Sequence, residues 1–168
     1  GSRTQGFFAS RLLRRAEHRG RRNTREGSRR NISFHYDLGN DFYERWLDRG
    51  MQYSSAIRAE GDTLETAQQR KLDRIVDLLG LSGGERVLEI GCGWGAVAER
   101  LAAEKSCSVT GVTLSTEQLS YARARLAGAG LPADLRLQDY RDVDGVFDRI
   151  VSVEMIEAVG EEYWPSYF

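Results

Sequence analysis

Cysteine, histidine and long apolar runs are scarce in this chain of 168 residues, which contains two Cys and two His. Cys92 and Cys107 match neither a disulfide framework nor a metal-binding spacing, so the sequence predicts no metal site. The apolar stretch from Val109 to Leu114 is far too short to cross a bilayer. The first residues lack the pattern of a secretion signal. These absences lead us to expect a cytoplasmic protein in a reducing compartment.

Positive charge is concentrated at the start of the chain. Residues 1–30 contain ten Arg and two Glu, a net charge of +8, whereas the rest of the chain carries −9. Apolar residues recur at helical spacing over residues 6–18, which predicts either an amphipathic helix on an anionic membrane or a solvated linker. An arginine-rich arm also suits nucleic acid, but the acidic body carries no recognised nucleic-acid-binding module. We therefore expect peripheral association with a membrane and no nucleic acid partner.

Aromatic residues crowd together where the composition changes, between Phe34 and Trp46. Asn40 or Asp41 is placed to cap a helix that continues to Leu47. Aromatic side chains at this spacing are more typical of a core than of a ligand cage. This stretch therefore predicts one short, partly buried helix.

From residue 63 onward the pattern predicts regular elements, beginning with a helix over Thr63–Leu79 that stops at Gly80. The predicted strands are Arg86–Ile90, Ser108–Leu114, Leu135–Gln138 and Phe147–Val153, and the helices between them are Ala96–Lys105 and Thr116–Ala127. Short apolar strands separated by longer helices indicate βαβ units around a parallel sheet. The predicted fold class is α/β, with a ligand crevice at the carboxyl ends of the strands.

Glycine occupies alternate positions at Gly91, Gly93 and Gly95, between a strand end and a helix start. Glycine permits positive φ and close approach of a ligand, and the helix start offers N–H groups to an anion. The G-x-G-x-G spacing differs from the dinucleotide fingerprint, Trp94 leaves little room for a pyrophosphate, and Thr113 stands where an acidic residue would hold a ribose. A nicotinamide-dependent oxidoreductase is therefore a disfavoured alternative, and a plain tight turn is another.

The segment Glu89–Gly95 resembles the first motif of S-adenosylmethionine-dependent methyltransferases. Further segments are similar to one family, the cyclopropane-fatty-acyl-phospholipid synthases and mycolic acid cyclopropane synthases: His35–Tyr43, Met51–Ser55, Gly111–Ser115 with Gln118, and Phe147–Glu157. The similarity covers residues 31–168 almost without a gap. It implies a Rossmann-like class I methyltransferase domain over 31–168, preceded by a basic arm or linker over 1–30.

The resemblance implies that the domain binds S-adenosylmethionine. The loop and three residues before it would hold the amino acid end, Thr113 and Gln118 the ribose hydroxyls, and residues 139–141 the adenine. The implied cofactor-binding residues are Tyr36, Tyr53, Ser54, Glu89, Gly91, Cys92, Gly93, Trp94, Gly95, Thr113, Leu114, Gln118, Asp139, Tyr140 and Arg141. For Tyr140 alone, a half-buried strand aromatic is an equal alternative.

The resemblance further implies transfer of a methyl or methylene group to the double bond of unsaturated acyl chains of phospholipids. Family members use a bicarbonate ion as the active-site base, and Glu157 matches the glutamate that helps to hold it, although a solvated glutamate at a helix start is the alternative. Tyr36 would place an aromatic face beside cationic charge on the substrate. Ser55 stands where many relatives carry Cys, and Ala158 where they carry His, so the product is a cyclopropane or a methyl or methylene branch.

The family fold continues with three more strands, which supply a His and a Tyr to the bicarbonate site. The histidines of this chain are His18 and His35, neither of which can fill that role. We therefore expect a chain truncated after the fourth strand and inactive alone, completed by a second chain or a homodimer partner. The alternative is a non-catalytic fragment that binds the cofactor or a partner.

Overall fold

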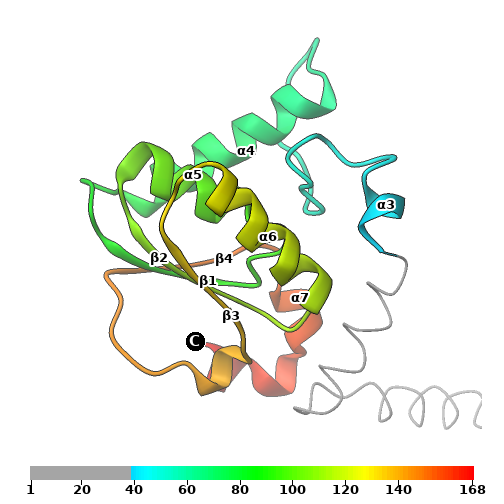
Figure 1. Ribbon diagram of the computed structural model, residues 1–168. Helices are drawn as coiled ribbons and strands as arrows, with labels where there is room; N and C mark the ends of the chain where they lie inside the picture. The colour runs from blue at the N-terminus through cyan, green and yellow to red at the C-terminus, as the bar shows by residue number, and fades with distance from the viewer. Residues whose placement is uncertain (1–38) are drawn as a thin grey trace, which may run out of the picture.

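The computed structural model describes residues 39–168 (Figure 1). The predicted arm and amphipathic helix lie outside this range, as does Tyr36. The elements are α3 (Asn40–Tyr43), α4 (Leu64–Leu79), β1 (Arg86–Ile90), α5 (Ala96–Lys105), β2 (Ser108–Thr113), α6 (Thr116–Gly128), β3 (Ala133–Leu137), the 3-10 turn η1 (Tyr140–Asp142), β4 (Arg149–Ser152), α7 (Ile156–Val159), η2 (Glu161–Tyr163) and α8 (Trp164–Tyr167). Strands and helices alternate from β1 to β3, and this confirms the predicted α/β class.

The four strands form one parallel sheet in the order β3-β2-β1-β4. Strand β1 is paired on both sides, with Ile90 opposite Val112 of β2 and opposite Ser152 of β4. The chain runs from β1 outward to β2 and β3 and then returns to the far side of β1, so the strand order reverses there. Ligands of open α/β sheets bind outside the carboxyl ends of the strands at such a switch point.

Helices α4, α5 and α6 cover one face of the sheet, and in Figure 1 they lie together above the strands. Val87 and Val109 of the sheet share a core there with Leu101 of α5 and Leu126 of α6, all buried to 2% exposure or less. Burial of one such side chain stabilises the fold by about 1.5–3 kcal/mol. This core fixes the strands and the start of α5 relative to one another.

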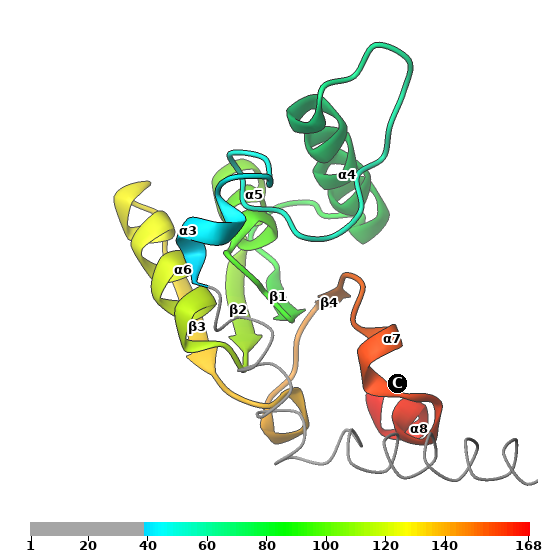
Figure 2. The same cartoon turned by 90° about the vertical axis from the view of Figure 1, so that its right-hand side faces the viewer.

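A smaller cluster covers the opposite face of the sheet. Leu88, Ile90 and Val112 pack there against Tyr140 of η1 and Tyr167 of α8. Figure 2 shows that the chain leaves β4 and continues through α7 to α8 beyond that strand. The segment after β4 therefore folds back to pack beside η1 and close this face.

Most predicted boundaries agree with the structure to within two residues. Strand β1 and helix α5 have the predicted bounds. Thr63 is the N-cap of α4, and its hydroxyl accepts the N–H of Thr66 at 3.2 Å. Gly80, with φ of 57°, ends that helix in the left-handed conformation expected of a C-terminal glycine.

The other strands differ slightly from the prediction because pairing and turns, not hydropathy, set their ends. Strand β2 stops before Leu114, since the Thr113 hydroxyl accepts the Ser115 N–H at 3.2 Å and begins the turn into α6. Strand β3 begins at Ala133, which pairs with β2 before the apolar run starts. Strand β4 covers only Arg149–Ser152, the four residues that pair with β1.

The prediction for the first helix is wrong in both its length and its cap. Helix α3 ends at Tyr43, whereas the sequence predicts a helix that continues to Leu47. Gly39, with φ of 74°, occupies the N-cap position, and no side chain caps the helix. The Asn40 side chain instead accepts a hydrogen bond from the indole of Trp94 at 2.7 Å. A tertiary contact thus uses the side chain that local sequence assigns to capping.

A turn around Asp48 redirects the chain after α3. The buried Asp48 carboxylate accepts the N–H groups of Gly50 and Gln52 at 2.9 and 2.7 Å, and the Gln52 amide at 2.9 Å. Three local bonds to one carboxylate offer the backbone an alternative to helix. The following residues therefore run towards α4 as an irregular segment.

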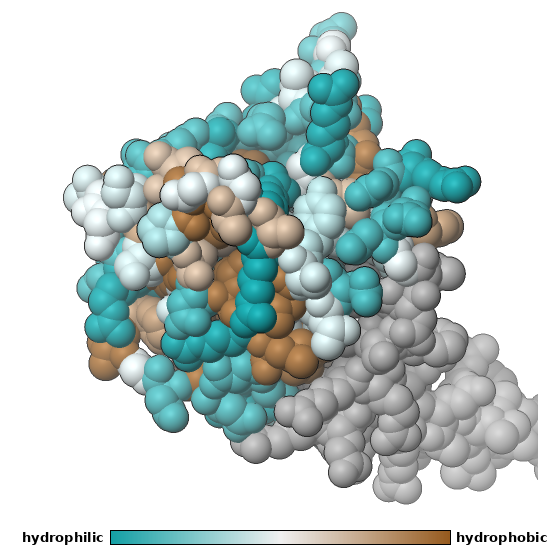
Figure 3. Space-filling view, viewed as in Figure 1, coloured by the Kyte–Doolittle hydropathy of each residue, from teal (hydrophilic) through white to brown (hydrophobic). Residues whose placement is uncertain are grey.

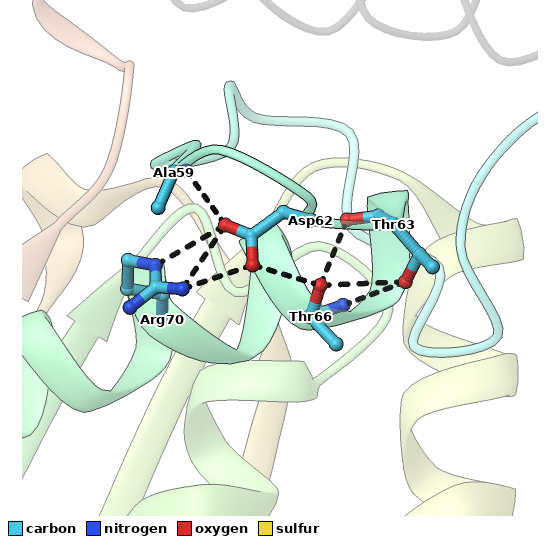
Figure 4. Close-up of polar contacts among 5 residues, drawn as sticks. All are labelled: Ala59, Asp62, Thr63, Thr66 and Arg70. Atoms are coloured by element: carbon cyan, nitrogen blue, oxygen red, sulfur yellow. Dashed lines mark hydrogen bonds and ion pairs between the residues drawn. The ribbon is translucent and has the colours of Figure 1, made fainter.

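The start of α4 is fixed by a network around Asp62 (Figure 4). The Asp62 carboxylate accepts the Ala59 N–H at 2.7 Å and the Arg70 guanidinium at 2.9 Å. Thr66 donates its hydroxyl to the same carboxylate at 3.2 Å. The hydrogen bond from Arg70 lowers the pKa of Asp62 more than any other contact. The network closes residues 59–62 onto the first turns of α4.

Within residues 39–168 no helix is both long enough and apolar enough to cross a bilayer. The same range holds no group of three or more His, Cys, Asp and Glu arranged as metal ligands. Figure 3 shows hydrophilic side chains around the outside of one face and apolar ones near its middle. Strand β4 forms one edge of the sheet, where Ile150 is 60% exposed.

Candidate functional site

The sheet brings most of the predicted site segments to one edge. The loop Gly91–Gly95 follows β1, Leu114 follows β2, Asp139 lies just beyond β3, and Glu157 lies on α7 just beyond β4. Because parallel strands end on the same side of a sheet, these connections lie side by side. The candidate site is this carboxyl edge.

Main-chain hydrogen bonds hold the glycine loop against β2. The N–H groups of Gly91 and Cys92 both donate to the Val112 carbonyl, at 2.9 and 3.0 Å. All three glycines of the loop have positive φ, the region that favours glycine. A Cβ on Gly91 would stand 2.6 Å from Sδ of Met155, so a larger residue there would displace the Met155 side chain.

Helix α5 starts at the end of this loop, and no side chain caps its first turn. Its N-cap is Gly95, which supplies no capping side chain. A Cβ on Gly95 would meet Ala122 at 3.0 Å, so α6 packs closely behind the loop. The N–H groups of the first turn and the positive end of the helix dipole suit an anionic group.

Glu89, at the end of β1, is buried with 4% exposure. Burial raises its pKa to about 8, against the opposing effect of a hydrogen bond from the Ala98 backbone. Its Oε2 atom has no hydrogen-bond partner among residues 39–168. A buried, unpartnered carboxyl oxygen next to the loop suits a cationic donor on a ligand. Burial also raises the pKa of the Cys92 thiol, which therefore stays protonated and unreactive.

Trp94 joins the loop to α3. Its indole donates to Asn40, its ring lies 5.1 Å from that of Tyr43, and only 2% of the residue is exposed. Tyr43 in turn lies 5.9 Å from the ring of Tyr53, which is 55% exposed. The structure therefore brings Tyr53 into an aromatic cluster next to the loop, with its ring partly accessible.

Thr113 and Gln118, predicted to act together, are in contact. The Thr113 hydroxyl donates to the Gln118 side-chain carbonyl at 3.1 Å, and both residues are buried. The Gln118 N–H donates to the Ser115 hydroxyl at 3.2 Å, which caps α6. Leu114 is half-buried between them in the chain. These contacts hold the two polar side chains together at the end of β2.

The residues after β3 are organised by one ion pair. Arg141 donates its Nε to Asp139 at 2.8 Å, and its guanidinium lies over the Tyr140 ring at 5.5 Å. Tyr140 also contacts the ring of Tyr167 edge-on, at 5.2 Å. Burial raises the pKa of Tyr140, whose hydroxyl has no hydrogen-bond partner within residues 39–168. The Asp139 carboxylate is thus engaged by Arg141, a contact that sequence reasoning did not anticipate.

The segment after β4 contacts the irregular segment that precedes α4. The Ser55 N–H donates to Oε1 of Glu154 at 2.9 Å. Glu154 has a φ of 52°, which is unusual for a residue other than glycine. Ser54 binds Lys71 of α4. Glu157 is exposed on α7.

Sequence reasoning missed Asn40, Lys71, Glu154 and Met155 as contributors to this edge. Lys71 carried a usable signal, because it lies four residues from both Ala67 and Ile75 on the apolar stripe of α4. A lysine in such a stripe is buried only when it has polar partners. The contact of Asn40 with Trp94 spans 54 residues and has no local signal.

Residues 23–168 match the protein family described as mycolic acid cyclopropane synthetase. The chain is 47% identical over 155 residues to the tuberculostearic acid methyltransferase UfaA1 of Mycobacterium tuberculosis, covering 86% of this chain and 36% of that protein. It is 52% identical over 134 residues to the cyclopropane-fatty-acyl-phospholipid synthase of Escherichia coli, covering 80% and 35%. The chain thus spans about a third of the length of these curated relatives.

Solved structures show the same fold. The mycolic acid cyclopropane synthase CmaA1 complexed with SAH and CTAB superposes with a TM-score of 0.79 at 33% identity, covering 83% of this chain and 50% of that one. The cyclopropane synthase MmaA2 of Mycobacterium tuberculosis gives 0.75 at 35% identity, covering 79% and 47%. The parallel sheet with flanking helices is therefore the class I methyltransferase fold expected from the sequence.

Proposed function

The chain belongs to the mycolic acid cyclopropane synthetase family, and from this premise we propose that it binds S-adenosylmethionine in a lipid-modifying enzyme. That enzyme transfers a methyl or methylene group to the double bond of an unsaturated acyl chain of a phospholipid. The observation that carries the proposal is the G-x-G-x-G loop at the switch point beside β1, in a chain similar to enzymes named for lipid methylation and cyclopropanation.

The residues at the carboxyl edge fit the parts of S-adenosylmethionine. The unpartnered oxygen of Glu89 suits the ammonium of the amino acid end, and the first turn of α5 suits its carboxylate. Tyr53 and Ser54 lie on the irregular segment that faces the same end. Thr113 and Gln118 supply polar groups for the ribose hydroxyls. When bound, the cofactor supplies an electrophilic methyl group.

We assign the adenine to residues 139–141. Asp139 is 4% exposed and binds Arg141 through its carboxylate, and the Tyr140 ring contacts both Arg141 and Tyr167. An adenine ring beside Tyr140 would contact the aromatic ring of Tyr140 and the buried carboxylate of Asp139. The assigned ligand contains no pyrophosphate, so these residues need not bind one.

The chain's own residues have separate tasks in the proposed reaction. Attack by the alkene on the methyl group leaves positive charge on the acyl chain, which an aromatic face of Tyr36 would stabilise by about 1–2 kcal/mol. Loss of a proton from the added methyl group then gives a ring or a methylene branch, and loss from a neighbouring chain carbon gives a methyl branch beside a retained double bond. We assign Glu157 and Ser55 to holding the bicarbonate that would accept this proton.

The product is a cyclopropane ring or a methyl or methylene branch. Relatives with names of both kinds are comparably similar to this chain. Ser55 and Ala158 stand where many family members carry Cys and His. Ser55 makes the contact with Glu154, and Ala158 follows four residues later on α7, so we expect the product to be decided around this contact.

We also propose a cytoplasmic protein that associates peripherally with anionic membranes. The domain over 31–168 would be held at the surface by the basic arm over 1–30, whose ten Arg each contribute roughly 1 kcal/mol when close to the surface. This brings the catalytic edge to the phospholipid acyl chains.

A second candidate function is a non-catalytic fragment that binds the cofactor or a partner. Such a chain would bind its ligand without turnover. Under this alternative, activity needs a second chain or a homodimer partner that supplies the remaining site residues.

Two measurements test the proposal. Titration calorimetry with S-adenosylhomocysteine and with NAD should show binding of the first ligand alone; binding of NAD alone would overturn the proposal.

For activity, the chain replaces the matching 134 residues of the Escherichia coli synthase in a strain that lacks this enzyme. Lipid mass spectrometry should then show a ring or a branch, and unmodified lipids with a folded chimera would favour the non-catalytic alternative.

A further inference from the structure

Helix α4 presents a buried ammonium group to the candidate site. Lys71 is 6% exposed, and its Nζ lies 2.7 Å from the Ser54 hydroxyl and 3.5 Å from the Ser54 carbonyl. Burial lowers its pKa, while the carboxylates of Asp48 and Glu154 act in the opposite direction. Burial of a lysine is costly, so a specific contact is expected to justify it.

The side chains around Lys71 hold residues 52–55 in place. Gln68, one turn earlier on α4, donates its amide to the carbonyls of Gln52 and Ser54, at 3.2 and 2.9 Å. From the other side, Glu154 accepts the Ser55 N–H. The next residue after Glu154 is Met155, which packs on Gly91 of the glycine loop. This series of contacts places Ser54 beside the loop.

The contact with Lys71 determines whether the Ser54 hydroxyl donates or accepts its further hydrogen bond. An ammonium group has donors only, so Oγ of Ser54 must accept from Nζ of Lys71. The hydroxyl hydrogen is then left to donate, and within residues 39–168 Lys71 is the only side-chain partner of this hydroxyl. Because the donor to Oγ is charged, it also polarises the hydroxyl and strengthens the bond that Ser54 can give.

We propose that Lys71 is a positioning residue that fixes the Ser54 hydroxyl as a hydrogen-bond donor to the carboxylate at the amino acid end of the cofactor. This inference rests on the proposed function and adds a residue that lies behind the ligand contact. Lys71 acts through Ser54 and does not itself contact the ligand.

The test compares two ligands that differ in the amino acid end. S-adenosylhomocysteine carries this end, whereas 5′-methylthioadenosine has the same nucleoside and thioether without it. Lys71→Met should weaken S-adenosylhomocysteine binding about tenfold or more, the typical effect of a lost hydrogen bond to a charged group. Binding of 5′-methylthioadenosine should change less than about twofold. Arg74→Met, an exposed position on the same helix, should change neither.

A double-variant cycle shows whether Lys71 acts through Ser54. Ser54→Ala alone should give a similar selective loss, and Lys71→Met in that background should add little. Thermal unfolding confirms that each variant is folded. Should Lys71→Met fail to fold, Lys71→Gln replaces it, because the amide still donates to Ser54 without a charge, and a smaller selective loss is expected.

The outcomes separate this inference from the proposed function. Failure of the unaltered chain to bind S-adenosylhomocysteine would overturn the proposed function itself. Normal binding by the chain with equal losses of both ligands in the Lys71 variant would show a structural role only. Unchanged affinity, or fully additive effects of Lys71 and Ser54 variants, would overturn the assignment of Lys71.

Discussion

At the scale of single residues, Glu89 and Gly91 lie two positions apart and are constrained differently: Glu89 buries a carboxyl group, and Gly91 has no side chain. Glu89 places a carboxyl group where water has little access, and the chain accepts the cost of keeping it protonated. Gly91 gives up a side chain so that Met155 can approach the loop. Each constraint has a measurable consequence in the absence of any ligand.

Glu89→Gln should flatten the pH dependence of stability. The pKa of Glu89 is about 8 in the folded chain, against an ordinary value of 4.5. Above about pH 4.5 Glu89 loses its proton in the unfolded chain but keeps it in the folded chain. The free energy of unfolding of the unaltered chain therefore falls as pH rises towards 8, by up to about 1.4 kcal/mol per pH unit. The amide does not titrate. Denaturant unfolding between about pH 5 and pH 8 measures this, with exposed Glu117→Gln as the control; parallel curves for Glu89→Gln and the unaltered chain would contradict it.

Gly91→Ala should destabilise the fold more than Gly93→Ala. Both glycines have positive φ, of 78° and 52°, and an alanine there costs about 1–2 kcal/mol. A Cβ on Gly93 meets nothing within 4 Å, whereas one on Gly91 meets Met155 at 2.6 Å. Adding Met155→Ala should recover part of the Gly91→Ala loss. Thermal unfolding without ligand provides the comparison, and equal losses for the two glycine variants would show that the clash is absorbed.

At the scale of elements, local sequence predicted the regular structure and missed the contacts between segments. The bounds of β1 and α5 were predictable from the spacing of apolar residues. For α4, the apolar spacing, the N-cap Thr63 and the C-cap Gly80 all indicate the same bounds. Helix α3 was not predictable, because Asn40 binds a tryptophan far along the chain. The predicted loop and strand ends do meet at one edge, since parallel topology dictates it. The ion pair of Asp139 with Arg141 is local, but sequence reasoning assigned both residues to ligand binding instead. The buried Lys71 was missed although its place on the apolar stripe of α4 indicates polar partners.

Asn40→Ala should loosen α3 without unfolding the sheet. The change removes the acceptor that lies 2.7 Å from the Trp94 indole, a loss of about 1 kcal/mol. Because α3 has only four residues, it depends on this contact and on the packing of Tyr43. Hydrogen exchange should accelerate over residues 40–47 and stay unchanged in β1. Exposed Glu44→Ala is the matched control, and acceleration spread evenly over the chain would rule out a local role.

At the scale of the whole molecule, charge is separated along the chain, with +8 over residues 1–30 and −9 over the remainder. The sequence alone predicted the family and the fold class, because several motifs in the right order are more specific than any one glycine loop. It left the product open, since Ser55 and Ala158 depart from the pattern of many relatives. The roles of Tyr36 and of the arm lie outside the described residues and stay predictions.

Removal of residues 1–30 should abolish binding to anionic vesicles. The arm supplies the positive charge, and attraction to a membrane surface is screened over about 10 Å at 0.1 M salt. Sedimentation with vesicles of anionic phospholipid should retain the full chain at low salt and release it as salt rises. Neutral phosphatidylcholine vesicles serve as the control. Binding that persists without the arm, or that ignores salt, would assign the membrane contact to another surface.

Strand β1 has hydrogen-bonded neighbours on both sides, so the loop after it is anchored on a rigid support. The facing half of the candidate site, residues 52–55, belongs to no ladder and is held by side-chain contacts with Asp48, with Tyr43, with α4 and with Glu154. Substitutions at Ser55 and the residues after it can reshape what lies opposite the methyl donor while the cofactor contacts assigned to Tyr53 and Ser54 are kept. A family built this way can vary its products while cofactor affinity is retained, and swapping residues 55–57 between relatives should transfer product choice between them.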